Sequence, residues 1–363
     1  MKPLARLRIA ILMALAALGL PMHVVATAHA QEKVTILLAT GIQIGHVREF
    51  VAKQLGFFAE EGLDVTIQPA QGSAEQLQFM TAGKGTLGSI DMHMVLELRK
   101  KGIRLVSPYS HFQKGVYRIG VLEGSPVKTL ADLKGKPVGV PTKSSGAYTF
   151  LLAAARQAGV QESDMEIIPV TFGPAAAQAL IQRRIVAIST TTGGFNNIRY
   201  LSDGAKDWKL REIRVPMNAW PTNALIVTED EARHKRRMVL GLLRAFAKGH
   251  VFVAASPEAA LDVAQKLYPE LVQEKDKPRL GRILRWTIED MWTSERSKDK
   301  PLGWFDPEAW AGTEGYYKAE GLMEKHQSLK EIIDESLLVE ANSFDKERIR
   351  AMAREMATQR RER

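Results

Sequence analysis

Two kinds of apolar pattern alternate along most of this 363-residue chain. Short runs rich in β-branched residues are typical of buried strands, whereas an apolar residue at every third or fourth position is typical of a helix. We expect strands over 34–40, 63–68, 86–90, 103–107, 115–122, 138–140, 165–170, 185–189, 210–215 and 222–228. Strands that alternate with helices predict an α/β fold of parallel sheets with right-handed crossovers.

Helical patterns fill most of the intervals between these strands. We expect helices over 47–60, 74–82, 94–101, 147–159, 175–183, 231–255, 257–267, 276–292 and 307–320, with a charged tail after them. The helix and strand within 77–90 resemble those within 176–189 in pattern. We therefore expect two similar αβ blocks in tandem.

The N-terminus has the pattern of an export signal. Lys2, Arg6 and Arg8 form a basic start, residues 9–20 are apolar, and small side chains occupy Ala28 and Ala30. We expect cleavage after about Ala30 and a periplasmic mature protein. The apolar run is too short for a spanning helix, and we expect no membrane span after it.

Composition excludes several kinds of chemistry. The sequence has no cysteine, which rules out disulfides, thiolate metal sites and cysteine nucleophiles. Its net charge is +9, and solvated faces at 233–237 and 360–363 account for much of it. No basic patch with interleaved aromatic residues is present, so we expect no nucleic-acid partner. The 8 histidines show no metal-ligand spacing, so we expect no metal and no cofactor.

Small polar and aromatic residues gather where the predicted strands end. The polar ones are Thr40, Gln43, Ser73, Asp91, Gln113, Ser144, Ser145, Thr171, Thr191 and Thr192, and the aromatic ones are Tyr109, Phe112, Tyr148, Phe172, Phe195 and Trp220. Ligands of open α/β sheets bind beyond the carboxyl ends of the strands, in sites with apolar walls and a few polar groups. Loops are polar in any protein, which explains any single one of these residues equally well.

One of these strand exits, Val138 to Tyr148, has the pattern of an anion site. A short buried strand leads into a loop with Ser144, Ser145 and Gly146, and a helix begins there. Free backbone N–H groups and the positive helix end favour an anion in such a loop, and the hydroxyls would add donors. Capping of the helix by one serine would explain the same residues without a ligand.

Asp91 and His93 form a candidate acid–base pair at another strand exit. A hydrogen-bonded structural histidine is the alternative at this position. His46, near a helix start, either touches the ligand or is solvated. There is no G-x-S-x-G motif that would indicate a serine hydrolase.

Two segments resemble the solute-binding proteins of ABC importers for sulfonates, taurine, nitrate and thiamine-precursor pyrimidines. They are FVAKQLGFFAEEGLDV at 50–65 and LADLKGKPVGV at 130–140, with Ala82-Gly83-Lys84 between them. The resemblance covers about 34–310. It implies a two-lobed periplasmic-binding-protein fold of type II, with a ligand cleft between the lobes and a helical C-terminal extension.

The resemblance also implies the domain boundaries. A signal peptide at 1–30 would precede lobe 1 at 31–118 and 218–363, with lobe 2 at 119–217 and hinge crossings at 115–122 and 214–220. Relatives often carry Gly-x-x-Asp where this chain has Gly83-Lys84-Gly85-Thr86 and Arg183-Arg184-Ile185-Val186. The ligand therefore cannot be copied from any member. The fungal-type pyrimidine synthases of this superfamily use a Cys-rich motif that is missing here, so we do not expect an enzyme.

In the family, the loop matching 144–146 grips the anionic group of the ligand, and loops matching 41–43 and 72–73 contribute from the other lobe. The ligand-binding residues that we predict are Thr40, Gly41, Gln43, Gly72, Ser73, Asp91, Phe112, Ser144, Ser145, Gly146, Thr191, Thr192 and Trp220. Asp91 would face an amine if the ligand has one, and Phe112, Phe195 or Trp220 would cover an apolar body.

We therefore expect a monomeric substrate-binding protein that captures a small organic, anionic solute and delivers it to an ABC permease in the inner membrane. One alternative is a periplasmic signalling protein that binds such a ligand and docks on a membrane sensor. Another is a hydrolase or isomerase that uses Asp91 and His93.

Overall fold

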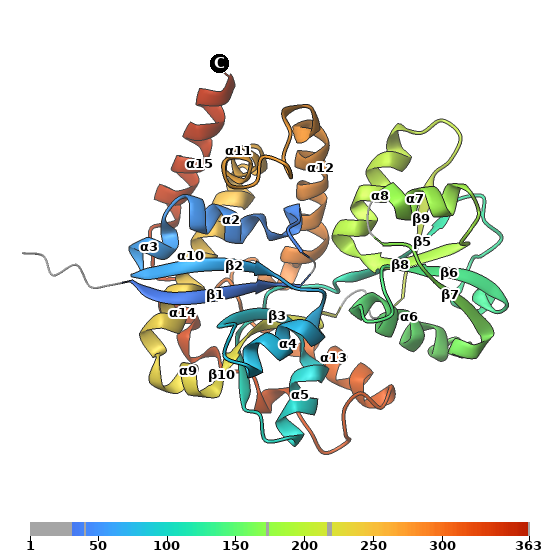
Figure 1. Cartoon of the computed structure of the whole chain (residues 1–363), viewed down its shortest axis with the longest axis horizontal. Helices are drawn as coiled ribbons and strands as arrows, with labels where there is room; N and C mark the ends of the chain where they lie inside the picture. Colours follow the sequence, from blue (N-terminus) through green and yellow to red (C-terminus); the bar gives the residue numbers. More distant parts are fainter. Residues whose placement is uncertain (1–30, 40, 172–173, 216–219, 362–363) are drawn as a thin grey trace, which may run out of the picture. The chain divides into compact units, whose positions relative to one another are not determined.

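The computed structural model describes residues 31–39, 41–171, 174–215 and 220–361, which contain two five-stranded sheets. The first sheet has the order β2-β1-β3-β10-β4 and consists of β1 (Glu32–Leu38), β2 (Leu63–Pro69), β3 (Leu87–Asp91), β4 (Leu105–Tyr109) and β10 (Asn223–Thr228). The second has the order β7-β6-β8-β5-β9 and consists of β5 (Tyr117–Leu122), β6 (Lys136–Val140), β7 (Met165–Pro169), β8 (Ala187–Thr191) and β9 (Leu210–Ile213). We call each sheet with its helices lobe 1 and lobe 2 (Figure 1).

The two sheets have the same topology, which confirms the tandem arrangement. In both, three parallel strands at one side of the sheet (β2-β1-β3 and β7-β6-β8) are followed by an antiparallel strand, β10 in lobe 1 and β5 in lobe 2. The parallel sheets expected from the sequence are therefore present only in part, because each sheet also contains an antiparallel strand that was not expected. The reason is that β5 and β10 are the strands by which the chain enters each lobe, so they begin at the edge where the parallel strands end.

Helices cover both faces of the first sheet (Figure 1). The helices of lobe 1 are α2 (Val47–Gln54), α3 (Phe57–Glu60), α4 (Ser73–Thr81), α5 (Met92–Lys100), α9 (Glu229–His234), α10 (Arg236–Ala255), α11 (Pro257–Leu267), α12 (Lys277–Thr287), α13 (Pro307–Ala319), α14 (Leu338–Ala341) and α15 (Lys346–Arg361). The helix expected over 47–60 is interrupted at Gly56, whose φ of 78° ends α2. By length and composition α10 alone among the described helices could span a membrane, but 78% of its apolar window is buried, as in a core helix.

Lobe 2 contains α6 (Gly146–Gln157), α7 (Pro174–Ile181) and α8 (Thr192–Gly204). The sequence pattern did not predict α8, because Gly193 and Gly194 disfavour a helix start. The glycine is needed for packing, since a Cβ on Gly194 would lie 2.4 Å from Oγ1 of Thr190. Short helices complete the described chain: η1 (Ile44–His46), η2 (Leu130–Leu133), η3 (Glu162–Asp164), η5 (Glu274–Asp276), the π-helix η6 (Ile288–Trp292), η7 (Glu295–Ser297), η8 (Leu329–Glu331) and η9 (Glu335–Leu337).

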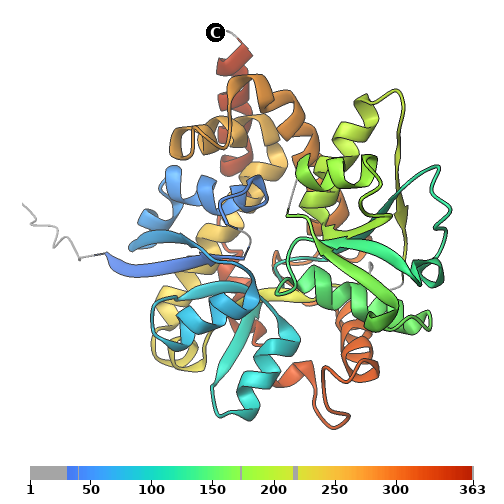
Figure 2. The same ribbon diagram turned by 45° about the vertical axis from the view of Figure 1, so that its right-hand side comes forward.

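The first crossing between the lobes is shorter than the sequence suggested. Tyr117 already pairs with Thr191 of β8, so the boundary expected at 118 falls inside a strand of the second sheet. The crossing is therefore made by residues 110–116, which precede β5. Of the second expected crossing, 214–220, residues 216–219 lie outside the described part of the chain. Figure 2 shows lobe 2, in green, beside α12, in orange, and beside α13, in orange-red.

Candidate binding site between the lobes

A cavity of about 110 Å³ lies where strand ends of both lobes meet. We call it the central cavity, and it is lined by Ala39, Gln43, Ile44, Gly45, His46, Ser89, His111, Phe112, Val116, Tyr117, Thr191, Gly193, Asn197, Asn223, Ile283, Leu284, Thr287 and Met291. Lobe 2 contributes β5, β8 and α8, lobe 1 contributes the exits of β1 and β4, and α12 with η6 closes one side. The site therefore depends on both lobes.

The lining combines apolar walls with a few hydrogen-bonding groups. Ile44, Phe112, Val116, Ile283, Leu284 and Met291 are apolar, whereas hydroxyl, amide and imidazole groups supply the polar contacts. No lysine, arginine, aspartate or glutamate is among the residues described as lining it. This is the composition of a site for a small organic molecule. A charged ligand group would have to be bound there without a facing counter-charge.

His111 forms the polar floor of the central cavity. Its Nδ1 lies 2.7 Å from Oγ of Ser89, and its ring stacks on Phe112 with centroids 4.0 Å apart. Burial, together with the nearby charge of Arg48, lowers the pKa of His111 well below its usual value. The imidazole is therefore neutral near pH 7, with one ring nitrogen as donor and the other as acceptor.

A buried arginine, Arg48, contacts His111 from outside the central cavity. Arg48 is 0% exposed, and its NH1 donates to the carbonyl of His111 at 3.3 Å. Its guanidinium carbon lies 3.9 Å from the ring centroid of Trp292 and 4.8 Å from that of Phe246, in cation–π geometry. Burial lowers the pKa of Arg48 to about 10, so the group stays charged at neutral pH. It gives the cavity a positive field without lining it.

The π turn of η6 holds the crossing segment against the cavity. The carbonyl of Met291 accepts hydrogen bonds from the backbone N–H groups of Gln113 (2.9 Å) and Lys114 (3.3 Å). The carbonyl of Asp290 accepts from NH2 of Arg118 at 3.0 Å. Both carbonyls lie in the last turn of η6, where backbone acceptors have no intrahelical partner, and π turns are frequent at functional sites. Here the freed acceptors bind the segment that enters lobe 2.

Polar contacts join the lobes on both sides of the central cavity. On one side, NH1 of Arg279 in α12 donates to Oδ1 of Asn197 in α8 at 3.0 Å, and Nδ2 of Asn196 donates to Oδ2 of Asp290 at 3.4 Å. On the other side, the carboxylate of Glu320 lies 3.0 Å from NH1 of Arg156 in α6. These contacts hold the lobes together around the cavity.

Three of the predicted ligand-binding residues, Gln43, Phe112 and Thr191, line the central cavity. Thr40 lies outside the described residues. Gly41 pairs with Ala39 in an isolated bridge and does not line the cavity. Thr192 is buried between Thr191 and Gly193, which both line the cavity. The Oγ1 atom of Thr192 has no hydrogen-bond partner within the described chain.

The Ser144–Gly146 loop does not line the central cavity, and its hydroxyls have protein partners. Oγ of Ser145 accepts from the backbone N–H of Tyr148 at 3.3 Å and donates to the carbonyl of Thr142 at 2.7 Å. This is the capping role that the sequence had left open. A Cβ on Gly146 would lie 1.9 Å from the hydroxyl oxygen of Tyr117, so the glycine makes room for that ring. A ligand role for this loop remains a prediction.

The loops predicted to contribute from lobe 1 lie close to this one. A Cβ on Gly72 would lie 3.6 Å from the carbonyl oxygen of Ser144, so the two loops face each other across the lobe junction. Oγ of Ser73 accepts from the backbone N–H of Asp91 at 3.2 Å. Neither Gly72 nor Ser73 lines the central cavity.

Asp91 belongs to a separate buried cluster. Its carboxylate accepts from the hydroxyl of Tyr317 at 2.5 Å and lies 2.9 Å from Nδ1 of His93. Burial and the charge of Asp91 raise the pKa of Tyr317 well above its usual value, so the phenol is protonated. The cavity beside this cluster is only about 10 Å³. It is too small to hold a substrate against Asp91 and His93.

Of the three aromatic residues predicted to cover an apolar part of the ligand, one lines the central cavity and two do not. Phe112 lines the central cavity, whereas Trp220 packs on α13, where a Cβ on Gly312 would lie 2.3 Å from its Nε1. Phe195 packs in lobe 2, 3.2 Å from the position of a Cβ on Gly120. Trp220 and Phe195 are therefore packing residues in this structure.

Several lining residues were not among those predicted from the sequence. Ser89, His111, Asn197, Asn223 and the α12–η6 residues Ile283, Leu284, Thr287 and Met291 all reach the cavity, and His46 is buried at its edge. His111 could have been found, because it lies in the exit loop that already contained Phe112 and Gln113. The α12 residues gave no such signal, since an apolar helix face is the same whether it covers a core or a ligand.

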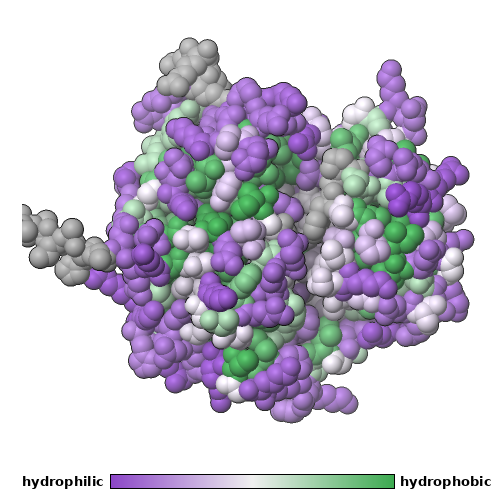
Figure 3. Space-filling view, viewed as in Figure 1, coloured by the Kyte–Doolittle hydropathy of each residue, from purple (hydrophilic) through white to green (hydrophobic). Residues whose placement is uncertain are grey.

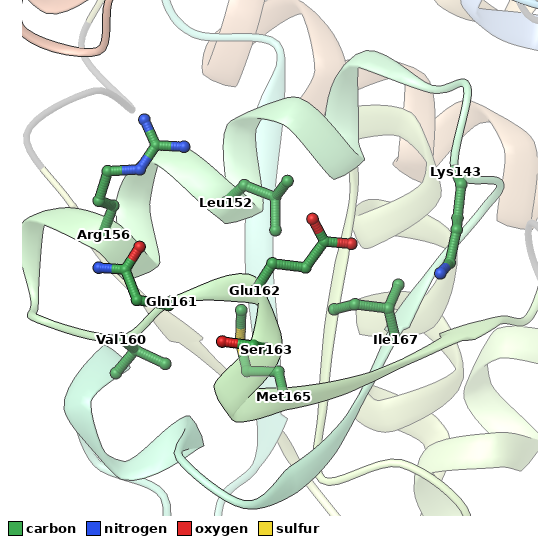
Figure 4. A pocket seen from close by; sticks show the side chains of 9 residues that line it. All are labelled: Lys143, Leu152, Arg156, Val160, Gln161, Glu162, Ser163, Met165 and Ile167. Carbon is green, nitrogen blue, oxygen red and sulfur yellow. The ribbon is translucent and has the colours of Figure 1, made fainter.

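A second hollow lies on lobe 2 alone (Figure 4). Leu152, Val160, Met165 and Ile167 form its apolar part, and Lys143, Arg156, Gln161, Glu162 and Ser163 surround them. Glu162 is already bound by the hydroxyl of Tyr148, and Arg156 by Glu320. This hollow does not involve lobe 1, so it lacks the shared lining of the central cavity.

Comparisons with known proteins agree with this geometry. The family model described as NMT1/THI5 like matches residues 43–260. The riboflavin-binding protein RibY of Chloroflexus aurantiacus is 22% identical over 302 residues, which cover 80% of this chain and 82% of that protein. The formylaminopyrimidine-binding protein of Halalkalibacterium halodurans is 24% identical over 288 residues, covering 77% and 83%.

A solved structure shares the fold. The periplasmic aliphatic sulphonate binding protein SsuA from Escherichia coli superposes with a TM-score of 0.58 at 20% identity, covering 85% of this chain and 99% of that one. All three of these proteins are named as binding proteins rather than as enzymes. Because the family model matches more than half of the chain, this protein belongs to the NMT1/THI5-like family and has the periplasmic-binding-protein fold.

Proposed function

We propose that this chain is the extracytoplasmic substrate-binding protein of an ABC importer, which encloses a small organic solute in the central cavity. The observation that carries the proposal is the shared lining: residues of both lobes and of α12 surround one cavity with apolar walls and few polar groups. We further propose that the mature chain begins after about Ala30, is periplasmic and acts as a monomer.

The lining favours a small planar heterocycle over a strongly charged solute. Phe112, Leu284 and Met291 offer apolar surface to a ring, while Asn197, Asn223 and Thr191 offer hydrogen bonds to its edge. An anionic group would be bound by these neutral donors in the field of Arg48, which keeps open the anionic solute expected from the sequence. The names of the riboflavin- and formylaminopyrimidine-binding relatives support the heterocycle.

The size of the cavity limits the solute. At about 110 Å³ it is below the roughly 300 Å³ at which pockets for drug-sized ligands begin. A single-ring solute fits this arrangement better than a three-ring flavin, which would require the lobes to separate further. Closure is driven only by contacts that the ligand makes in the closed state, so contacts to both lobes are required.

The surface supports a reversible contact with a permease. Leu201 and Val339 are the only large apolar side chains that are exposed in the described part of the chain. The face seen in Figure 3 is correspondingly dominated by hydrophilic residues, with apolar residues in scattered groups. Transient partners meet through polar surfaces of this kind, whereas obligate partners bury apolar ones.

The two alternatives have less support. Asp91 and His93 are bonded to each other and to Tyr317, beside a cavity too small for a substrate, which disfavours the hydrolase or isomerase. A signalling protein would share the central cavity, but neither RibY nor the formylaminopyrimidine-binding protein is named as a sensor.

The test is a ligand screen of mature residues 31–363 by thermal shift, followed by calorimetry of each hit. The panel contains pyrimidines, flavins, sulfonates, nitrate, carboxylates and amino acids. A ligand at about 100 times its Kd should add about 2.7 kcal/mol of stability. Asn223→Ala should abolish the response, whereas Gln359→Ala, at an exposed position of α15, should preserve it. Chemical conversion of a bound compound, or a response equal in wild type and Asn223→Ala, would overturn the proposal.

A further inference from the structure

Lobe 1 contains a second cavity, of about 180 Å³, behind the floor of the central cavity. We call it the basic cavity. It is formed by the end of β4, by α10, by the segment after η6 and by the first turns of α15, and its lining includes His111, Trp292, Lys300, Lys346 and Arg350. His111 lines both cavities, so the two cavities share one residue of their walls.

The charged residues that are described as lining the basic cavity are all positive. Lys298, Lys300, Lys346 and Arg350 line it, and no aspartate or glutamate is among the lining residues that the structure describes. Lys298 pairs with Glu295 and Arg350 with Glu347. Within the described ranges, Lys300 and Lys346 form no ion pair with a carboxylate. Two cations therefore remain for a ligand.

Three residues that line the basic cavity have buried polar atoms without a partner among the described residues. Tyr109 is 0% exposed and Trp292 is 3% exposed, and both line the cavity. Neither the hydroxyl of Tyr109 nor Nε1 of Trp292 has a hydrogen-bond partner among the described residues. Nε2 of His111 is unpaired in the same way. A buried donor without a partner is rare in a native protein, and each one requires an explanation such as a bound ion.

We propose that the basic cavity binds a small oxyanion of the phosphate or sulfate class. Unpaired N–H and O–H groups in the interior would hydrogen-bond its oxygens, and the ammonium groups of Lys300 and Lys346 would balance its charge at the entrance. The site is distinct from the central cavity, because it lies within lobe 1 and uses no residue of lobe 2. The proposal does not depend on which solute the central cavity binds.

The experiment titrates inorganic phosphate, and separately sulfate, into the mature protein by calorimetry, with sodium chloride added to keep the ionic strength constant. Lys346→Gln and Trp292→Phe should each weaken binding roughly 10-fold, because the first removes a positive charge and the second removes a buried N–H donor. Lys128→Gln, an exposed lysine of lobe 2, is the matched control and should leave the Kd unchanged. Phosphate that gives no heat with the wild-type protein would overturn the proposal.

One further variant separates the two cavities. Asn223→Ala alters the central cavity alone and should preserve phosphate binding. Loss of phosphate binding in Asn223→Ala, with Lys346→Gln unaffected, would place the anion in the central cavity and overturn the second site. Lys346 is only partly buried at the start of α15, so its variant should keep the wild-type melting temperature.

Discussion

The hydroxyl of Tyr317 donates a 2.5 Å hydrogen bond to Oδ1 of Asp91, and so joins helix α13 to the end of strand β3. Tyr317 is 1% exposed and Asp91 is 5% exposed. We expect Tyr317→Phe to lower the free energy of unfolding by about 1–3 kcal/mol, because it leaves a buried carboxylate oxygen without its donor. Urea unfolding measures the loss.

Tyr316→Phe is the control for this change, since Tyr316 is the neighbouring phenol and its hydroxyl is not bonded to Asp91 in the described structure. It should change stability by less than Tyr317→Phe. Equal losses in both variants would show that the hydrogen bond from Tyr317 to Asp91 adds nothing to stability beyond the loss of any phenol hydroxyl at this place.

Ser145→Ala tests the helix cap in lobe 2. The variant removes the acceptor of the Tyr148 N–H, so the free energy of unfolding should fall by about 1 kcal/mol. Ser145→Gly should lower it by only a few tenths of a kcal/mol. Ligand affinity should not change, because Ser145 does not line the central cavity. A large loss of affinity at unaltered stability would instead support the anion-gripping role expected from the sequence.

The contacts on either side of the central cavity should control closure. Glu320→Gln weakens the link to Arg156, and Asp290→Asn weakens the link to α8. Because Arg156 and Asp290 are partly exposed, solvent screens both links, and each change should cost at most about 1 kcal/mol, or roughly 5-fold in ligand affinity. The double variant should also show a larger radius of gyration in solution scattering. Glu324→Gln breaks an ion pair with Lys100 inside lobe 1 and should alter neither quantity.

Acid should destabilise the fold through His250. Burial, with the charges of Arg48 and Lys346, lowers the pKa of His250 to about 3 from 6.5. Between these values the unfolded chain binds a proton that the folded chain does not. Stability is therefore complete above about pH 6.5 and falls by roughly 1 kcal/mol for each pH unit below it. His111, whose pKa is lowered for the same reason, should add to the loss.

Urea midpoints at about pH 7.5 and about pH 5.5 measure this slope. His250→Phe should reduce the slope, whatever it does to stability at neutral pH. His234→Phe, at an exposed position on α9, should leave the slope as in the wild-type protein. A slope unchanged by His250→Phe would mean that other groups cause the acid sensitivity.

The fold could be predicted from the sequence because strand patterns are local. All ten expected strands are present, and the resemblance of 77–90 to 176–189 corresponds to equivalent helix–strand pairs in the two sheets. The direction of β5 and β10 could not be predicted, since it depends on how the chain passes between the lobes. The start of α8 was missed because a packing requirement at Gly194 overrides its low helix propensity.

The site was only partly predictable. Gln43, Phe112 and Thr191 were found because they follow or end strands, where ligands of such sheets bind. Polarity alone could not separate Asp91, whose partners are protein groups, from Asn223, which lines the central cavity. Met291 and Leu284 reach the site from a helix more than 150 positions beyond Phe112, and no local pattern records that contact.

The π turn of η6 determines where the connection between the lobes can bend. Because Gln113 and Lys114 are fixed to the carbonyl of Met291, and Val116 accepts from the N–H of Thr192 in lobe 2, both ends of the connection are clamped. Any rotation of one lobe against the other along this connection must therefore come from backbone dihedral changes in the few peptide units around Gly115. This hinge lies next to Met291, which also lines the central cavity. A solute that contacts the Met291 side chain therefore acts directly beside the hinge of the lobe closure that its binding drives.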